Sequence, residues 1–359
     1  MSPEGFDDDE MAENYRIYTL KKILFIVICI IAVVAVIGYA ATIGSSNISA
    51  TDVYRDIWYH FVDPSRCDPT IDWAVFDIRL PRIIGGLIVG SCLGVAGAAM
   101  QSMMKNPLAD PYTTGISSGA SFGAALMFIL GISRIPTGGN YNLSVTLNAA
   151  ILAMVPTLAI VIISKHRRIT PTTMILAGIA VMYLFNACTT LIKLGISDES
   201  LSAVFQWSVG DLSQVTWSNC AVMCLFTVAG TAVLMAMSKK LNILITGDKN
   251  ATALGLNAHR LRIVLLIIIS LMAASVVCFT GIIGFIGLVA PHIVRIFLGS
   301  DNRYLIPASA AFGAVLLMVA DLISRVVIAP TFLPVGVITA FIGCPMFLYL
   351  LIKQRRSMW

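Results

Sequence analysis

Charged side chains are scarce in this sequence. Asp, Glu, Lys and Arg make up 12% of the 359 residues, whereas hydrophobic residues make up 58%. A soluble domain carries roughly 25% charged residues, because its surface must face water. A chain with so little charge cannot cover itself with polar surface. The composition therefore excludes an ordinary soluble protein and predicts one whose solvent is the lipid bilayer.

The apolar runs also have few ionisable residues, which argues against a proton- or sodium-coupled carrier, since such carriers place charges at membrane depth. Asp321 is the main exception, and it lies one helical turn before Arg325. This spacing predicts a local i, i+4 ion pair rather than a proton relay. A secondary carrier or channel that works without ATP stays open as the less favoured alternative.

Signatures of catalysis and metal binding are missing as well. The four histidines are scattered without an HExxH motif, and the apolar runs hold no paired carboxylates. Seven of the eight cysteines lie in apolar runs and Cys67 stands alone outside, which predicts neither a metal centre nor a disulfide framework. No Gly-Lys dipeptide occurs, so there is no P-loop. We therefore expect a non-catalytic chain without metal or cofactor. If transport is driven by ATP, the ATP and Mg²⁺ must be bound by a separate ATPase.

Long apolar runs are what the sequence does have. A helix needs about 20 apolar residues to cross the hydrocarbon core, and continuous runs favour helices over a barrel. The ten runs are 23–43, 83–103, 113–131, 146–164, 174–194, 218–237, 262–280, 282–298, 304–325 and 335–352. The boundary between the seventh and eighth stays open, because Gly281, Gly284 and Gly287 cluster there. We predict an all-α polytopic membrane protein, with residues 1–20 as a cytoplasmic tail and residues 21–359 as a single transmembrane domain.

Lysine and arginine predict the orientation of these helices. With the N-terminus inside and ten alternating crossings, 17 of the 24 basic residues fall inside and 7 outside. Cytoplasmic loops carry such an excess, so both termini are expected in the cytoplasm and the protein in the cytoplasmic membrane. The net charge of +5 then belongs to loops beside a bilayer, and we expect no nucleic-acid partner.

The longest cytoplasmic loop, 239–261, could bind a partner. Asp248 can begin a short helix with Ala251 and Leu254 on one face, and Gly255 can end it. Such a face suits a groove on a partner, but it equally suits the bilayer surface. The residues alone leave both interpretations open.

Basic residues on the outer side run against the usual charge rule. Arg79 and Arg82 flank Pro81 at the outer start of the second run, and Arg325 lies at the outer end of the ninth. They could form charge-assisted pairs with an acidic partner, which we favour, or reach lipid headgroups.

Several motifs in fixed order resemble those of FecCD-type permeases, the type II ABC importer subunits for iron siderophores, haem and cobalamin. The resemblance covers roughly residues 20–353. The motifs lie at 79–82 (RLPR), 97–101 (GAAMQ), 106–111 (NPLADP), 115–120 (GISSGA), 176–178 (LAG), 284–292 (GFIGLVAPH), 320–321 (AD), 333–336 (LPVG) and 343–345 (GCP).

The resemblance implies ten helices and a machine of several chains. These are a second permease copy as a homodimer, with the pathway between the copies, two ATPase subunits inside, and an extracytoplasmic substrate-binding protein. The cargo would be an iron(III)-siderophore-type chelate, the family's commonest assignment, with cobalamin or another corrinoid, or haem, as alternatives. Specificity would reside in the binding protein.

The resemblance also implies roles for particular residues. Arg79, Arg82 and Arg325 would dock the binding protein. Residues 246–260, with Asp248, Ala251, Leu254 and Gly255, would couple to the ATPases. Asn106, Leu108 and Thr172 would form the cytoplasmic gate, and the fifth helix, 173–194, would line the pathway. At the gate, Pro171 departs from the hydroxyl residues that relatives often carry there.

Overall fold

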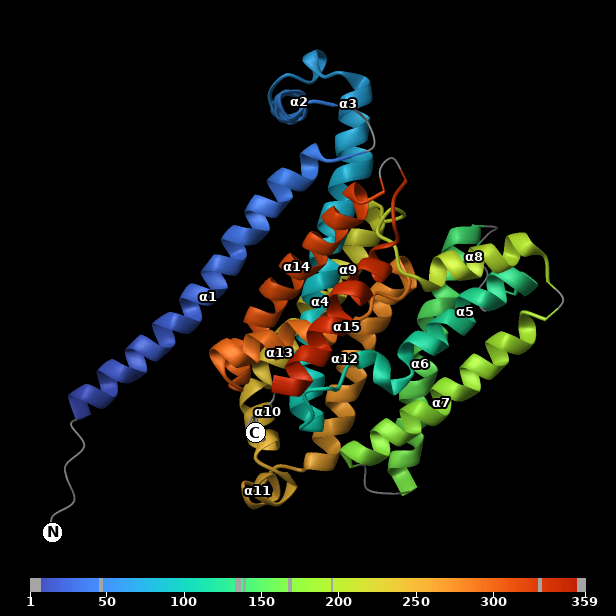
Figure 1. The fold of residues 1–359 in the computed structure, drawn as a ribbon. Helices are drawn as coiled ribbons and strands as arrows, with labels where there is room; N and C mark the ends of the chain where they lie inside the picture. Colours follow the sequence, from blue (N-terminus) through green and yellow to red (C-terminus); the bar gives the residue numbers. More distant parts are fainter. Residues whose placement is uncertain are drawn as a thin grey trace, which may run out of the picture.

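The computed structural model describes residues 8–44, 48–132, 137, 140–166, 170–194, 196–328 and 331–353. Within these residues every regular element is helical (Figure 1). The α-helices are α1 (Asp8–Thr42), α2 (Ala50–Val62), α3 (Pro69–Trp73), α4 (Leu80–Met104), α5 (Ile116–Leu130), α6 (Tyr141–His166), α7 (Pro171–Ile192), α8 (Asp198–Ser208), α9 (Trp217–Ala236), α10 (Ser238–Ile245), α11 (Asp248–Ala253), α12 (Ala258–Thr280), α13 (Ile286–Leu298), α14 (Asn302–Val326) and α15 (Val335–Lys353). Single turns of tighter or wider helix lie at η1 (Pro64–Arg66), η2 (Ala74–Arg79) and η3 (Pro111–Thr114).

The ten predicted runs each coincide with one helix: α1, α4, α5, α6, α7, α9, α12, α13, α14 and α15. Seven of these are long and apolar enough to cross a membrane, whereas α5, α13 and α15 are shorter apolar helices. The prediction of an all-α polytopic membrane protein is confirmed, because the periodicity and length of the apolar runs recur as helices in the same order.

Two boundaries differ from the prediction. The helix expected from residue 282 begins at Ile286, because Gly281 and Phe285 both have a φ of +68°, which breaks the helix between α12 and α13. The polar tail is helical from Asp8, so α1 extends well before the first apolar run.

Helix α4 lies at the centre of the bundle, between α13 and α14, and its small residues allow this close packing. A Cβ atom at Gly94 would lie 2.1 Å from the carbonyl oxygen of Ser309 on α14. A Cβ atom at Gly97 would lie 1.8 Å from the carbonyl oxygen of Gly287 on α13. Only glycine fits at these two contacts, as is typical where membrane helices pack backbone to backbone.

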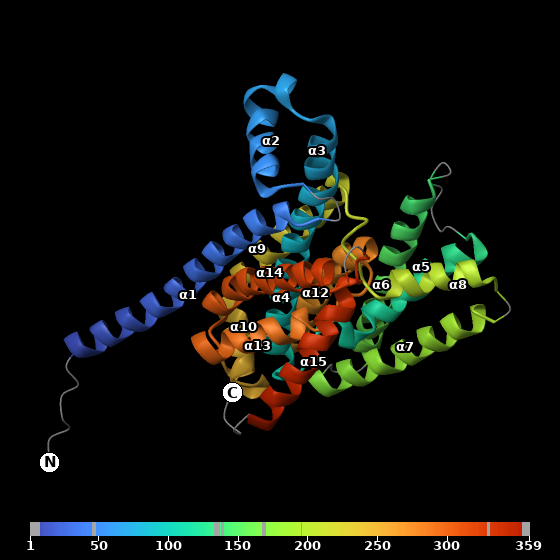
Figure 2. The ribbon, with the colours of Figure 1, turned by 45° about the horizontal axis from the view of Figure 1, so that its top comes forward.

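The two ends of the bundle carry different elements. The hairpin of α2 and α3 stands at one end, and α10 and α11 lie at the other (Figures 1 and 2). The start of α1 and the end of α15 are both on the side of α11, as an even number of crossings requires. Helix α1 leans against α14 at one flank, while α5, α6, α7 and α8 form the opposite flank.

Candidate functional site

Two buried arginines pair with one buried aspartate at the end of the bundle that carries α2 and α3, and a third buried arginine, Arg79, lies at the same end. Arg82 of α4 donates to Oδ1 of Asp321 from Nε at 2.9 Å and approaches it with Nη2 at 2.8 Å. Arg325 pairs with the other carboxylate oxygen, Oδ2, which confirms the predicted i, i+4 pair within α14. The contact with Arg82 was not predicted, because Arg82 and Asp321 are far apart in the sequence.

The same cluster holds the end of α1. Arg79 donates from Nη1 to the carbonyl of Ala41 at 2.8 Å, and Arg325 donates from Nη1 to the carbonyls of Ala40 and Ile43 at 3.3 Å each. Carbonyl groups at a helix C-terminus lack partners within the helix and carry partial negative charge, so guanidinium groups stabilise them. The arginines therefore join α1, α4 and α14 at this end.

Arg79, Arg82 and Arg325 are only 4%, 5% and 4% exposed, so the structure brings the three predicted docking residues together in a buried position. With Asp321, three positive charges and one negative charge leave a net +2. Their pairing with an acidic partner stays a prediction, since here they bond within the chain.

The predicted gate residues lie after the end of α4 and at the start of α7. Asn106 lies in the turn after α4 and accepts the N–H of Leu108 on its side-chain oxygen at 3.0 Å. Thr172 lies in the first turn of α7 rather than in the loop before it, because Thr170 caps this helix and Pro171 fits its first position. Pro171 thus has a helix-starting role. Within the described residues no hydrogen bond joins Thr172 to Asn106 or Leu108, and the gate stays a prediction.

The predicted coupling segment folds as α10 and α11 at the opposite end. Asp248 begins α11 as expected and forms two hydrogen bonds with Arg262 of α12, at 2.8 and 2.5 Å. The hydrogen bonds from Arg262 lower the pKa of Asp248 below its ordinary value. Arg262 is 1% exposed and also donates from Nε to the carbonyl of Met103 on α4 at 3.4 Å. This arginine therefore fixes α11 to the bundle.

The end of α11 agrees with the prediction only in part. Gly255 has a φ of +78°, and the N–H of Leu256 returns to the carbonyl of Ala251 at 2.8 Å, so the glycine ends the helix as expected. The prediction that Ala251 and Leu254 share an apolar face is wrong, because Ala251 is fully buried against the bundle whereas Leu254 is 65% exposed. Leu254 alone points its apolar surface outward.

A polar network attaches α10 to the same bundle end. Asn242 accepts the backbone N–H of Asn302 at 2.8 Å and donates to Asp301 at 2.7 Å. Asn302 in turn accepts the hydroxyl of Ser102 on α4 at 2.8 Å. Burial raises the pKa of Asp301, but hydrogen bonds from Arg303 and Asn242 outweigh this and lower it to about 2. The network links α10, α14 and α4 into one unit.

Two hollows open on the flank formed by α8 and its neighbours. A polar hollow of about 580 Å³ lies between the starts of α6 and α9, α8 and the end of α12. An apolar groove of about 710 Å³ lies between residues 282–285 and α15. Helix α7 also exposes apolar side chains outward, including Leu176 and Leu191 at 60% and 68%. The apolar groove and the outward face of α7 are weakly polar and suit a second chain, lipid or a bulky solute.

A family model described as the FecCD transport family matches residues 22–353, nearly the whole chain. The chain belongs to this FecCD transport family. Its full-length relatives include the Fe(3+)-citrate import system permease protein YfmD of Bacillus subtilis, 34% identical over 93% of this chain and 96% of the relative. The hemin transport system permease protein HmuU of Yersinia pestis is 33% identical over 88% of this chain and 92% of its own.

Other FecCD relatives carry different names. The cobalamin import system permease protein BtuC of Halobacterium salinarum is 38% identical over 76% of this chain and 72% of its own. A solved structure assigned to a metal-chelate type ABC transporter in an inward-facing conformation superposes with a TM-score of 0.79, covering 92% of this chain and 99% of that chain, at 24% identity. At that identity the structure supports the fold.

Family and fold agree with the helices described above. This FecCD chain is a multi-pass ABC transporter permease of the cell membrane.

Proposed function

We propose that this permease imports an iron(III)-siderophore-type chelate as part of a binding-protein-dependent ABC importer. The observation that carries the proposal is near-full-length similarity to permeases named for Fe(3+)-citrate, hemin and iron(3+)-hydroxamate import. The weakly polar outward faces suit a large cargo that is passed on without tight contacts. Cobalamin or another corrinoid, and haem, are the alternative cargoes, because relatives are named for cobalamin and for hemin.

Energy would come from another chain. The sequence has no P-loop, so ATP and Mg²⁺ would be bound by two separate ATPase subunits, and this chain would be non-catalytic and hold no cofactor. The cytoplasmic contact would be α11, since Arg262 holds this helix rigidly while Leu254 stays exposed for a partner. ATP-driven approach of the ATPases would then move α11, and through Arg262 also α12 and α4.

Two further partners complete the proposed importer. A second copy would form a homodimer across apolar faces such as those of α7 and α15, with the pathway between the copies. An extracytoplasmic binding protein with acidic side chains would dock near Arg79, Arg82 and Arg325, whose cluster with Asp321 has a net charge of +2. Such docking steers association and weakens with salt.

Native mass spectrometry of the tagged chain, extracted gently from its own membrane, tests the assembly. We expect two copies of this chain with two copies of a P-loop ATPase. ATP-dependent uptake into proteoliposomes, compared for an iron(III)-siderophore, cobalamin and haem, then identifies the cargo. A chain that is isolated alone and transports without ATP would favour the secondary carrier instead.

Docking has its own test. We expect Arg79→Glu to weaken binding of the cognate binding protein in a salt-dependent way, because a like charge would face its acidic residues. Arg66, an arginine on the same side with a 67% exposed side chain, offers Arg66→Glu as the control. Equal binding by Arg79→Glu and the wild type would favour the alternative, in which the outer arginines contact lipid headgroups rather than the binding protein.

A further inference from the structure

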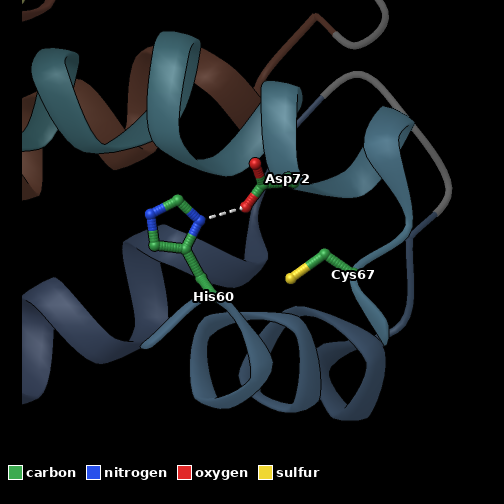
Figure 3. Close-up of side chains that lie close together, drawn as sticks. All are labelled: His60, Cys67 and Asp72. Carbon is green, nitrogen blue, oxygen red and sulfur yellow. Dashed lines mark hydrogen bonds and ion pairs between the residues drawn. The ribbon is translucent and has the colours of Figure 1, made fainter. Parts of the chain in front are cut away.

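The α2–α3 hairpin brings three different metal-ligating side chains together. His60 lies near the end of α2, Asp72 lies in α3, and Cys67 lies in the turn between them. One ligand atom from each of the three lies within 4.8 Å of the others. Figure 3 shows the Cys67 sulfur pointing toward the space beside the His60 ring and the Asp72 carboxylate.

These distances are close to those of a four-coordinate cation site. Nδ1 of His60 lies 2.5 Å from Oδ1 of Asp72. Zn²⁺ binds His nitrogen and carboxylate oxygen at about 2.0–2.2 Å, so two such ligands of one tetrahedral ion lie roughly 3.3 Å apart. To hold the ion, Nδ1 of His60 and Oδ1 of Asp72 would move apart by about 1 Å. The sulfur of Cys67 would move toward these two atoms by up to about the same distance. Rotation of these side chains supplies shifts of that size, since all three are partly exposed.

Negative charge gathers here without basic partners. Arg55 pairs with Asp52, and Arg66 pairs with Asp63. Over the described residues, neither lysine nor arginine forms an ion pair with Asp72 or with Asp56, which lies one turn before His60.

Asp56 adds an unsatisfied group beside the cluster. It is 4% exposed, and its Oδ1 accepts the N–H of Asp68 at 3.0 Å, directly after Cys67. Its Oδ2 has no hydrogen-bond partner among the described residues. A buried carboxylate oxygen without a donor is costly, and a nearby cation would offset that cost.

Contrary to the expectation from the sequence that this chain holds no metal, we propose that His60, Cys67 and Asp72 bind one Zn²⁺-class divalent cation on the outer hairpin, with water in the fourth position. One thiolate, one imidazole and one carboxylate are ligands that Zn²⁺ accepts together, whereas Mg²⁺ and Ca²⁺ prefer oxygen alone. The ion joins the end of α2 to α3 and closes the intervening turn. Because α3 continues through η2 into α4, the site stiffens the hairpin above the arginine cluster. This site is separate from the transport pathway.

Co²⁺ added to the purified full-length chain in nanodiscs is the first probe. We expect a thiolate-to-cobalt charge-transfer absorption that saturates at one Co²⁺ per chain and is displaced by Zn²⁺. The absorption disappears in Cys67→Ser, a near-isosteric change that preserves the fold, and persists in Cys224→Ser, a control at an exposed cysteine of α9. Absence of the absorption in the wild type, or its persistence in Cys67→Ser, overturns the proposal.

Zn²⁺ affinity, measured against a competing chelator, tests the other two ligands. We expect His60→Gln and Asp72→Asn each to weaken binding by at least about tenfold, since even indirect partners of a metal site matter by that factor. His259→Gln, at the cytoplasmic end, leaves the affinity unchanged. Unchanged affinity in both His60→Gln and Asp72→Asn would mean that His60 and Asp72 form only an ion pair. Size-exclusion elution of each variant verifies folding.

Discussion

Arg262 and Asp248 form a two-fold hydrogen-bonded ion pair that connects the first residue of α11 to the bundle. The guanidinium group is buried, with 1% of its side chain exposed, while the carboxylate is 51% exposed. Arg262 also reaches the carbonyl of Met103 at the end of α4. A single buried side chain of α12 thus joins α11 to the end of the central helix α4.

Removing the carboxylate should loosen α11. In Asp248→Ala the buried Arg262 loses its charged partner, and we expect a loss of about 1–3 kcal/mol in the local stability of this segment. Hydrogen exchange of residues 247–256 should quicken, and stimulation of ATP hydrolysis by loaded binding protein should fall. Asp248→Glu, which keeps the charge, should retain most of both. Slow exchange in Asp248→Ala would contradict the anchoring role.

The same pair predicts a pH response. The pKa of Asp248 is lowered in the folded chain, chiefly by hydrogen bonds from Arg262. Its contribution is therefore complete above the ordinary carboxyl pKa and is lost as the pH falls through the lowered value. We expect protection of α11, corrected for intrinsic exchange, to stay constant between about pH 5 and 8. Loss of protection within that window would show that another group controls α11.

The exposed Leu254 should contact the ATPase without supporting the fold. We expect Leu254→Ser to leave thermal unfolding unchanged, because the side chain is 65% exposed, and to reduce co-purification of the ATPase. Thr252→Ser, two residues earlier and within α11, is the control for a mild change on the same helix. If the ATPase co-purifies with Leu254→Ser as fully as with the wild type, α11 would instead lie on the bilayer surface.

The sequence predicted the helices well and the contacts between them poorly, for a physical reason. Apolar length is a strong local signal, so all ten runs recur as helices, and i, i+4 spacing sufficed for Asp321 and Arg325. The contact of Arg82 with Asp321 spans 239 residues, and no local pattern encodes it. The prediction that Ala251 and Leu254 share one exposed face failed for a similar reason. The ion pair of Arg262 with Asp248 sets which side of α11 faces the bundle, and the two residues are distant in the sequence.

Asp321 should be the least replaceable residue of the outer cluster. Asp321→Asn keeps the size of the side chain but leaves Arg82 and Arg325 buried without a carboxylate, which costs about 3–5 kcal/mol. The melting temperature in detergent should fall markedly. Ser324→Ala, which removes a 3.5 Å contact with Arg82, should cost about 0.5–1.5 kcal/mol. Equal melting temperatures for the two variants would mean that the cluster is solvated rather than buried.

The packing of α4 makes opposite predictions for two glycines. In Gly97→Ala the new Cβ would meet the carbonyl oxygen of Gly287 at 1.8 Å, so α4 and α13 must separate, at about 1–3 kcal/mol or more. In Gly284→Ala the Cβ would find no atom within 4 Å, and Gly284 has no positive φ, so stability should hold or rise slightly. Thermal unfolding of both variants checks this.

Because both changes add one methyl group close to α13, a similar loss of stability for Gly284→Ala would show that the connection 281–285 packs against something further, such as a second copy of the chain. An unchanged melting temperature for Gly97→Ala would instead show that α4 and α13 do not touch through their backbones.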